Sequence, residues 1–154
     1  MSKLKEEGKL ELTDPSEAMS KSYLKKADDC LRSARILLQN DLYENSVSMS
    51  YYTMYNSLTA LLFRVGVKCE NHSGSIVVFR RLFRRLDLYS AISFAKKERI
   101  DKQYYVDLSL TKKSAQDLLK ETEDFLVEMK LIMKNISNED IKKLRDNFNR
   151  VFAA

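Results

Sequence analysis

The sequence is short of the residues that interrupt helices. Its 154 residues include only three glycines and one proline. Because tight turns depend on these two residue types, an all-β fold is excluded and long helices with few connections are favoured. There is no run of about 18 uncharged apolar residues, and the N-terminal segment MSKLKEEGKLELT lacks the apolar core of a signal peptide. We therefore expect a cytoplasmic protein with one helical domain.

Histidine and cysteine are also scarce. His72 is the only histidine, and the two cysteines, Cys30 and Cys69, do not have the spacing of metal ligands. Asp28 and Asp29 have no second acidic cluster arranged toward them. The sequence thus predicts reduced thiols, no metal site and no cofactor.

Basic residues exceed acidic ones by a moderate margin, 27 to 22, which permits an anionic partner. Four arginines within six positions have no acidic residue between them, so they are candidate ligands for RNA phosphates or for an acidic partner surface. The alternative is a solvated helix face. A second basic group follows on the next predicted helix. Together the candidate nucleic-acid-binding residues are Arg80, Arg81, Arg84, Arg85, Lys96, Lys97 and Arg99.

The segment Leu42 to Gly66 is the one around which the rest is organised. Apolar residues recur along it at alternating spacings of four and three, and a row of small residues repeats this rhythm one position earlier. Such a helix has no fully charged face, so other helices should surround it. Its tyrosines, Tyr51, Tyr52 and Tyr55, are expected to pack in the core rather than to form a platform for nucleobases.

The remaining periodicity predicts an all-α, up-and-down antiparallel bundle of four to five main helices. We expect a flexible tail over residues 1–13, the bundle over 14–136, and an additional amphipathic C-terminal helix over 137–154. The first helix should start at Asp14, a candidate cap, and run to about Gln39. Later helices are expected from Ser73 through a buried stripe ending at Leu86, over Asp87 to Lys97, from Thr111, and from Ser137 or Asn138. The segment Ile100 to Leu110 has mixed periodicity, and its conformation stays open.

Several of these segments resemble one family. The residues that carry the likeness are, in chain order, Tyr23–Leu24, Ala27, Tyr43–Val47, Ser50–Tyr55, Ala60–Leu62, Gly66, the turn Asn71–Gly74, Arg99, Tyr104, Ala115 and Phe125–Leu126. In this order they resemble the HEPN family (higher eukaryote and prokaryote nucleotide-binding domain). The likeness covers about residues 23 to 128.

The resemblance implies a helical bundle, commonly a homodimer, that partners a minimal nucleotidyltransferase in toxin–antitoxin or defence-type systems. Active members are metal-independent ribonucleases that use an arginine followed after four to six residues by a histidine. Here the arginine is Arg99, and Tyr104, with Tyr105 beside it, stands where the histidine is expected. With a pKa of about 10, tyrosine is a poor general base. The resemblance therefore implies a degenerate nuclease motif, with RNA or nucleotide binding but without turnover.

Two other functions stay open at this point. One is an active metal-independent endoribonuclease toxin in which Arg99 works with Tyr104, Tyr105 or His72. The other is a purely structural interaction module. Within the turn formed by Asn71, His72 and Ser73, a histidine at a helix start more often bonds the backbone than orients a ligand, which favours a structural role for His72.

Overall fold

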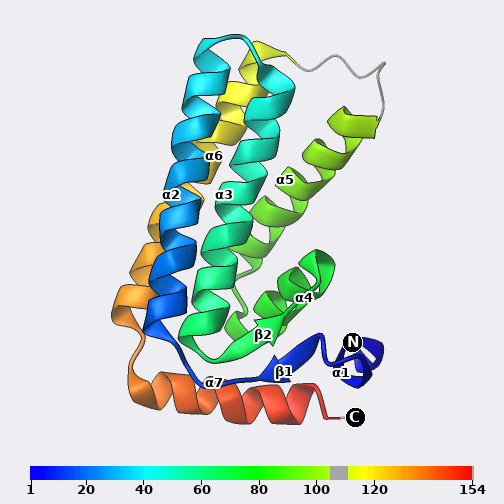
Figure 1. The fold of residues 1–154 in the computed structure, drawn as a ribbon, viewed down its shortest axis with the longest axis vertical. Coiled ribbons are helices and arrows are strands. Elements are labelled where there is room, and N and C mark those ends of the chain that lie inside the picture. Colours follow the sequence, from blue (N-terminus) through cyan, green and yellow to red (C-terminus); the bar gives the residue numbers. More distant parts are fainter. Residues whose placement is uncertain (105–110, 154) are drawn as a thin grey trace.

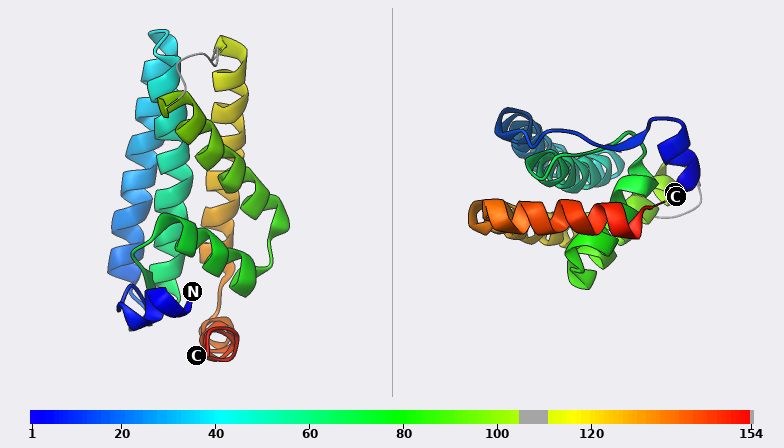
Figure 2. Two further views of the ribbon diagram at one scale, coloured as in Figure 1. Left: turned by 90° about the vertical axis from the view of Figure 1, so that its right-hand side faces the viewer. Right: turned by 90° about the horizontal axis from the view of Figure 1, so that it is seen from below.

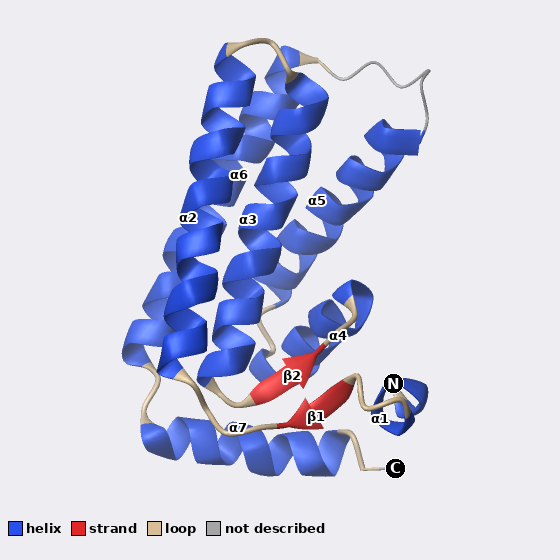
Figure 3. Ribbon diagram, in the orientation of Figure 1, coloured by secondary structure: helices blue, strands red, loops and turns tan. Residues whose placement is uncertain are grey.

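This computed structural model describes residues 1–104 and 111–153, without the side chains of residues 102–104. Within these residues it contains seven helices and a two-stranded sheet (Figure 3), so the predicted all-α bundle is confirmed. The elements are α1 (Ser2–Glu6), β1 (Leu10–Leu12), α2 (Glu17–Gln39), α3 (Tyr43–Arg64), β2 (Val67–Cys69), α4 (His72–Phe83), α5 (Leu86–Tyr104), α6 (Lys112–Asn135) and α7 (Asn138–Val151).

Helix α3 lies at the centre of the bundle, in contact with α2, α4, α5 and α6 (Figure 1). The apolar row predicted along it is buried throughout, from Val47 to Val65. The small-residue row is buried too, and at one point Ser46 Oγ donates to the Ala34 carbonyl of α2 at 2.8 Å. Small side chains allow the two backbones to approach closely. The expected helix surrounded by others is therefore present.

The first helix begins two residues later than predicted. Ser16, not Asp14, is the N-cap of α2, because its Oγ accepts a hydrogen bond from the Met19 amide at 3.1 Å. The reason is tertiary: the amides of Thr13 and Ser16 donate to the carbonyls of Gly66 and Phe63 at the end of α3. The chain is thus held in an extended path until Ser16.

The first 13 residues are not the irregular tail that the sequence predicts. They form α1 and β1, and β1 pairs antiparallel with β2 so that Leu10 lies opposite Cys69. Leu10 is only 2% exposed and belongs to the main core. A three-residue strand has no pattern of its own, and it forms here only because a distant segment supplies its hydrogen bonds.

The prediction for the third helix is wrong at both ends. Asn71, not Ser73, caps α4, since its Oδ1 accepts from the Gly74 amide at 2.7 Å. At the other end the helix stops at Phe83, because Arg84 adopts a left-handed conformation with φ of 55°. Arg84 and Arg85 thus lie outside the helix that carries Arg80 and Arg81. Leu86, expected in the buried stripe, is 59% exposed.

Helix α5 is longer than the predicted segment Asp87 to Lys97, and it ends at Tyr104. In Figures 1 and 2 it crosses the bundle obliquely on the side of α3 away from α2. Tyr105 lies outside the described residues, as does most of the segment whose conformation the sequence leaves open.

The last two helices start where the sequence predicts. Thr111 caps α6 and Ser137 caps α7, in the second case through a capping box with Asp140. Helix α7 lies across one end of the bundle (Figure 2). There Arg145 Nη1 donates to the carbonyls of Thr13, Val65 and Gly66 at 2.7, 3.1 and 3.0 Å. Gly66, which follows the end of α3, is left-handed, with φ of 73°. No helix among the described residues is long and apolar enough to cross a membrane.

Candidate functional site

Arg99 points into the bundle because it continues the buried stripe of α5. Leu88, Ile92 and Ala95 are buried, and the same alternating spacing reaches Arg99 next. Its Nη1 donates to the Tyr52 hydroxyl at 2.8 Å. The guanidinium carbon lies 5.2 Å from the ring centroids of both Tyr51 and Tyr52, within range for cation–π attraction. The arginine is therefore held on two tyrosines of α3.

His72, the first residue of α4, meets the same tyrosines. Its Nδ1 shares a hydrogen bond of 2.9 Å with the Tyr51 hydroxyl. Its ring stacks on that of Tyr55, with centroids 3.7 Å apart and an angle of 16° between the planes. Three helices thus bring five side chains together. We call Tyr51, Tyr52, Tyr55, His72 and Arg99 the Arg99 cluster.

The surroundings of His72 disfavour its protonated form. Burial lowers the pKa of His72, and the positive charges of Arg99 and Lys96 lower it further. Burial also raises the pKa of Tyr51, against a weaker opposing effect of Arg99. The cluster thus disfavours a second positive charge, on His72, beside the Arg99 guanidinium.

Arg99 has hydrogen-bonding capacity that the described residues do not use. A guanidinium carries five N–H donors, and among residues 1–104 and 111–153 the buried Nε finds no partner. Lys96, one helical turn earlier, donates through Nζ to Ser73 Oγ and places a second positive charge at the edge of the cluster. Phosphate or carboxylate oxygens suit such a pair of cations.

The cluster contains some of the residues that the sequence singles out, but not all of them. Tyr51 is fully buried, as expected, whereas Tyr52 and Tyr55 are only partly buried. Lys97 is exposed. Tyr104 ends α5, and its side chain lies outside the described residues. The approach of His72 to Arg99 was missed, and no pattern in the sequence marks it, because it depends on where α4 and α5 pack on α3.

The arginine quartet lies elsewhere and is divided. Arg85 is ion-paired with Asp87 at 2.8 Å and with Glu128 at 3.0 Å, and it lowers the pKa of Asp87 to about 2. The other three arginines are exposed. They line a surface hollow of about 710 Å³, the arginine hollow, formed by Val77, Arg80, Arg81, Arg84 and Leu86.

This hollow is distinct from the Arg99 cluster. His72 begins α4 and Arg84 follows its last residue, so at 1.5 Å per residue the two are roughly 18 Å apart.

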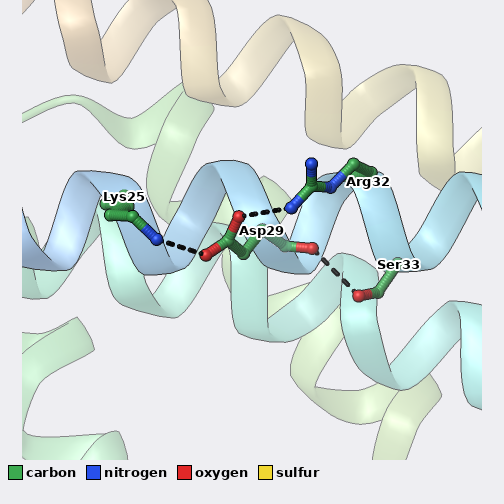
Figure 4. Close-up of polar contacts among 4 residues, drawn as sticks. All are labelled: Lys25, Asp29, Arg32 and Ser33. Atoms are coloured by element: carbon green, nitrogen blue, oxygen red, sulfur yellow. Dashed lines mark hydrogen bonds and ion pairs between the residues drawn. The ribbon is translucent and has the colours of Figure 1, made fainter.

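The acidic pair on α2 is engaged in surface ion pairs. Asp29 accepts from Lys25 at 3.1 Å and from Arg32 at 2.9 Å, and Ser33 Oγ donates to its carbonyl (Figure 4). Asp28 pairs with Lys130 at 2.7 Å. In the described part of the chain, no three His, Cys, Asp or Glu side chains are grouped as a metal would need.

The fold and the cluster place the chain in the class of small helical bundles that hold an arginine in contact with tyrosines of the central helix. The HEPN domain family matches residues 20–132, and the chain belongs to this family.

Relatives in bacteria and archaea are similar over different lengths. A protein of Thermotoga maritima named "UPF0332 protein" is 34% identical over 59 residues, which is 38% of this chain and 45% of that protein. Two proteins of Methanocaldococcus jannaschii are similar over most of the chain. "Putative toxin MJ0142" is 29% identical over 73% of this chain and 82% of its own length, and "Putative toxin MJ0605" is 28% identical over 71% and 85%. The chain thus spans less than half of the Thermotoga relative and more than four-fifths of the two archaeal ones.

Proposed function

We propose that this chain is a toxin-like HEPN protein of a toxin–antitoxin or defence-type pair, and that its Arg99 cluster binds a phosphate group of RNA or of a nucleotide. The observation that carries the proposal is the position of Arg99, which is held on Tyr51 and Tyr52 with N–H donors unused by the described residues. The archaeal relatives named as toxins support the first half of the proposal.

Binding without turnover fits the residues best. RNA cleavage without a metal needs a group that accepts the proton of the 2′-hydroxyl and another that protonates the leaving oxygen. Tyr104 stands where the family's active members have histidine, and tyrosine does this poorly at neutral pH. Arg99 can still hold a phosphate by charge-assisted hydrogen bonds.

A protein partner belongs to the same proposal. Members of this family commonly form homodimers and pair with a minimal nucleotidyltransferase, and we propose both associations for this chain. Co-expression with the product of the neighbouring gene, followed by co-purification, tests the pairing. If the two proteins do not co-purify at low salt, the proposed pairing is wrong.

Binding is tested with a single-stranded RNA and with a nucleotide at low salt, by fluorescence anisotropy. Arg99→Ala should weaken binding about tenfold or more, since a hydrogen bond to a charged group contributes about 1.5–3 kcal/mol. Arg32→Ala is the matched control, because it removes one positive charge from the exposed surface of α2 (Figure 4). Equal affinity for the wild-type protein and Arg99→Ala would overturn the proposal.

A second candidate function is metal-independent endoribonuclease activity. It is favoured by one observation, the position of His72 in the same cluster as Arg99, where both residues contact Tyr51. RNA cleavage in the presence of a chelator separates the two candidates. Cleavage that is lost in both His72→Gln and Arg99→Ala would favour the enzyme, whereas binding without cleavage by the wild-type protein favours the first proposal. Neither binding nor cleavage is the result expected of a purely structural module.

A further inference from the structure

The arginine hollow carries positive charge that the described chain leaves unpaired. Within residues 1–104 and 111–153 no carboxylate forms an ion pair with Arg80, Arg81 or Arg84, although Arg85, the next residue, forms two. Asp87 and Glu128 both pair with Arg85, and Glu6, which lines a neighbouring hollow together with Arg81, forms no ion pair with Arg81 in the described part of the chain. Three unpaired arginines around one hollow repel each other, and an anionic partner would relieve this repulsion.

Two of these arginines are held in place by aromatic rings. The guanidinium of Arg80 lies over Tyr89 at 4.9 Å from the centroid, and that of Arg81 lies over Phe152 at 5.6 Å. A guanidinium held near a ring keeps N–H donors, and a carboxylate can pair with them in bidentate fashion. Ordering the side chains in advance lowers the entropic cost of binding.

The third arginine occupies a position where glycine would be easier to accommodate. Arg84 ends α4 with φ of 55°, and its amide donates to the Arg80 carbonyl at 3.2 Å. Glycine is the usual residue at such a left-handed helix end, since other residues are strained there. The chain thus places a charged side chain at the rim of the hollow despite a cost in backbone strain.

The hollow is not purely cationic, because two apolar residues also line it. Val77 is partly buried, and Leu86, the first residue of α5, is 59% exposed. Phosphate groups have no apolar side chain that could pack against these two residues. A protein segment with a leucine or isoleucine beside its carboxylates has one.

We propose that the arginine hollow docks an acidic segment of a protein partner. Its carboxylates pair with Arg80, Arg81 and Arg84, and one apolar side chain packs against Leu86 and Val77. Single-stranded RNA fits less well, since its binding relies on bases stacked on open aromatic rings. Here the guanidinium groups of Arg80 and Arg81 lie over the rings of Tyr89 and Phe152, and Phe152 is buried. The inference rests on the proposed function only in requiring that a protein partner exists.

The probe for the experiment is a short synthetic peptide of glutamates with interspersed leucines, labelled for fluorescence anisotropy and titrated with the full chain at low salt. Arg84→Gly is the most informative variant, because glycine accommodates the left-handed backbone and folding should be at least as stable. We expect Arg84→Gly to weaken peptide binding about three- to tenfold, and Arg80→Ala to have the same effect. This loss lies between the contribution of an exposed ion pair and that of a hydrogen bond to a charged group. Leu86→Ser should also weaken binding.

The control Arg32→Ala removes the same charge from α2 and should leave the peptide affinity unchanged. Equal binding by all variants, or no binding by the wild-type protein, would overturn the inference. So would a single-stranded RNA that binds more tightly than the peptide and loses affinity in Arg84→Gly. If the peptide fails while the neighbouring gene's product co-purifies, the docking site is wrong and the proposed partnership stands. If the peptide binds and no partner co-purifies, the pairing proposal fails instead.

Discussion

At the scale of single residues, the feature that matters most is the pairing of His72 with Tyr51. A histidine at a helix start was expected to bond the backbone, and instead its Nδ1 shares a hydrogen bond with a buried tyrosine hydroxyl. The hydrogen bond and the stack on Tyr55 fix the ring next to Arg99. This histidine is therefore part of the candidate site, in either the binding or the catalytic proposal.

The pKa of His72 provides a direct test of this arrangement. We expect its titration midpoint to lie below 6.5, because burial and the charges of Arg99 and Lys96 disfavour the protonated ring. Since His72 is the only histidine, its ring proton gives one titrating signal in the proton NMR spectrum of the untagged protein. Arg99→Ala should move the midpoint upward. A midpoint at or above 6.5 in the wild-type protein would contradict the geometry.

The lowered pKa of His72 should also make the folded protein less stable at acidic pH. A histidine whose pKa is lower in the folded state contributes stability that is fully present above its unfolded pKa of about 6.5 and is lost as the pH falls through the folded pKa. Urea unfolding at several pH values between neutral and mildly acidic should show this loss in the free energy of unfolding. In His72→Gln the free energy of unfolding should depend less on pH.

At the scale of elements, helix ends account for most of the differences between prediction and structure. The periodicity of α3 predicts its buried face, because apolar spacing is a local property. Ser16 and Asn71 cap their helices only because bonds to other segments fix the chain just before them. Such bonds cannot be derived from candidate caps in the sequence.

The end of α3 allows a matched comparison of two glycines. Gly66 and Gly8 have φ of 73° and 68°, but a Cβ on Gly66 would lie 2.4 Å from the Thr13 carbonyl oxygen, whereas a Cβ on Gly8 meets nothing within 4 Å. Gly8→Ala should cost about 1–2 kcal/mol for the left-handed backbone alone. Gly66→Ala should add roughly 1–3 kcal/mol of overpacking and weaken the contact with Arg145. Denaturant unfolding of both variants gives the difference, and equal losses would show that the crowding is relieved without cost.

At the scale of the whole molecule, the first and last segments complete the lower end of the bundle. The strand β1 pairs with β2, and α7 lies across the same end, where Arg145 bonds the carbonyls that follow α3. Both segments lie outside residues 20–132, which the family matches. They therefore lie outside the matched bundle in sequence, yet Leu10 of β1 and Phe148 of α7 are part of its main core.

A substitution of Leu10 tests how much the packing of β1 contributes to stability. Because its side chain is 2% exposed and packs in the main core, Leu10→Ala should lower the free energy of unfolding by about 2–4 kcal/mol. Leu12→Ala, on the same strand but less buried, should cost less. Denaturant titration of the two variants tests the comparison. A loss at Leu10 no larger than that expected of a surface residue would mean that the N-terminal segment detaches from the bundle in solution.

The sequence by itself determined the helical class, the central place of α3 and the family resemblance, because all three depend on residue types and on spacing within one segment. Only the tertiary structure decided what surrounds Arg99 and which arginines have no ion-pair partner among the described residues. Arg99 and His72 both contact tyrosines of a third helix, α3. Arg85 does not line the arginine hollow and instead forms ion pairs with Asp87 and Glu128. These contacts join segments far apart in the chain, so their energies depend on packing that no local pattern encodes.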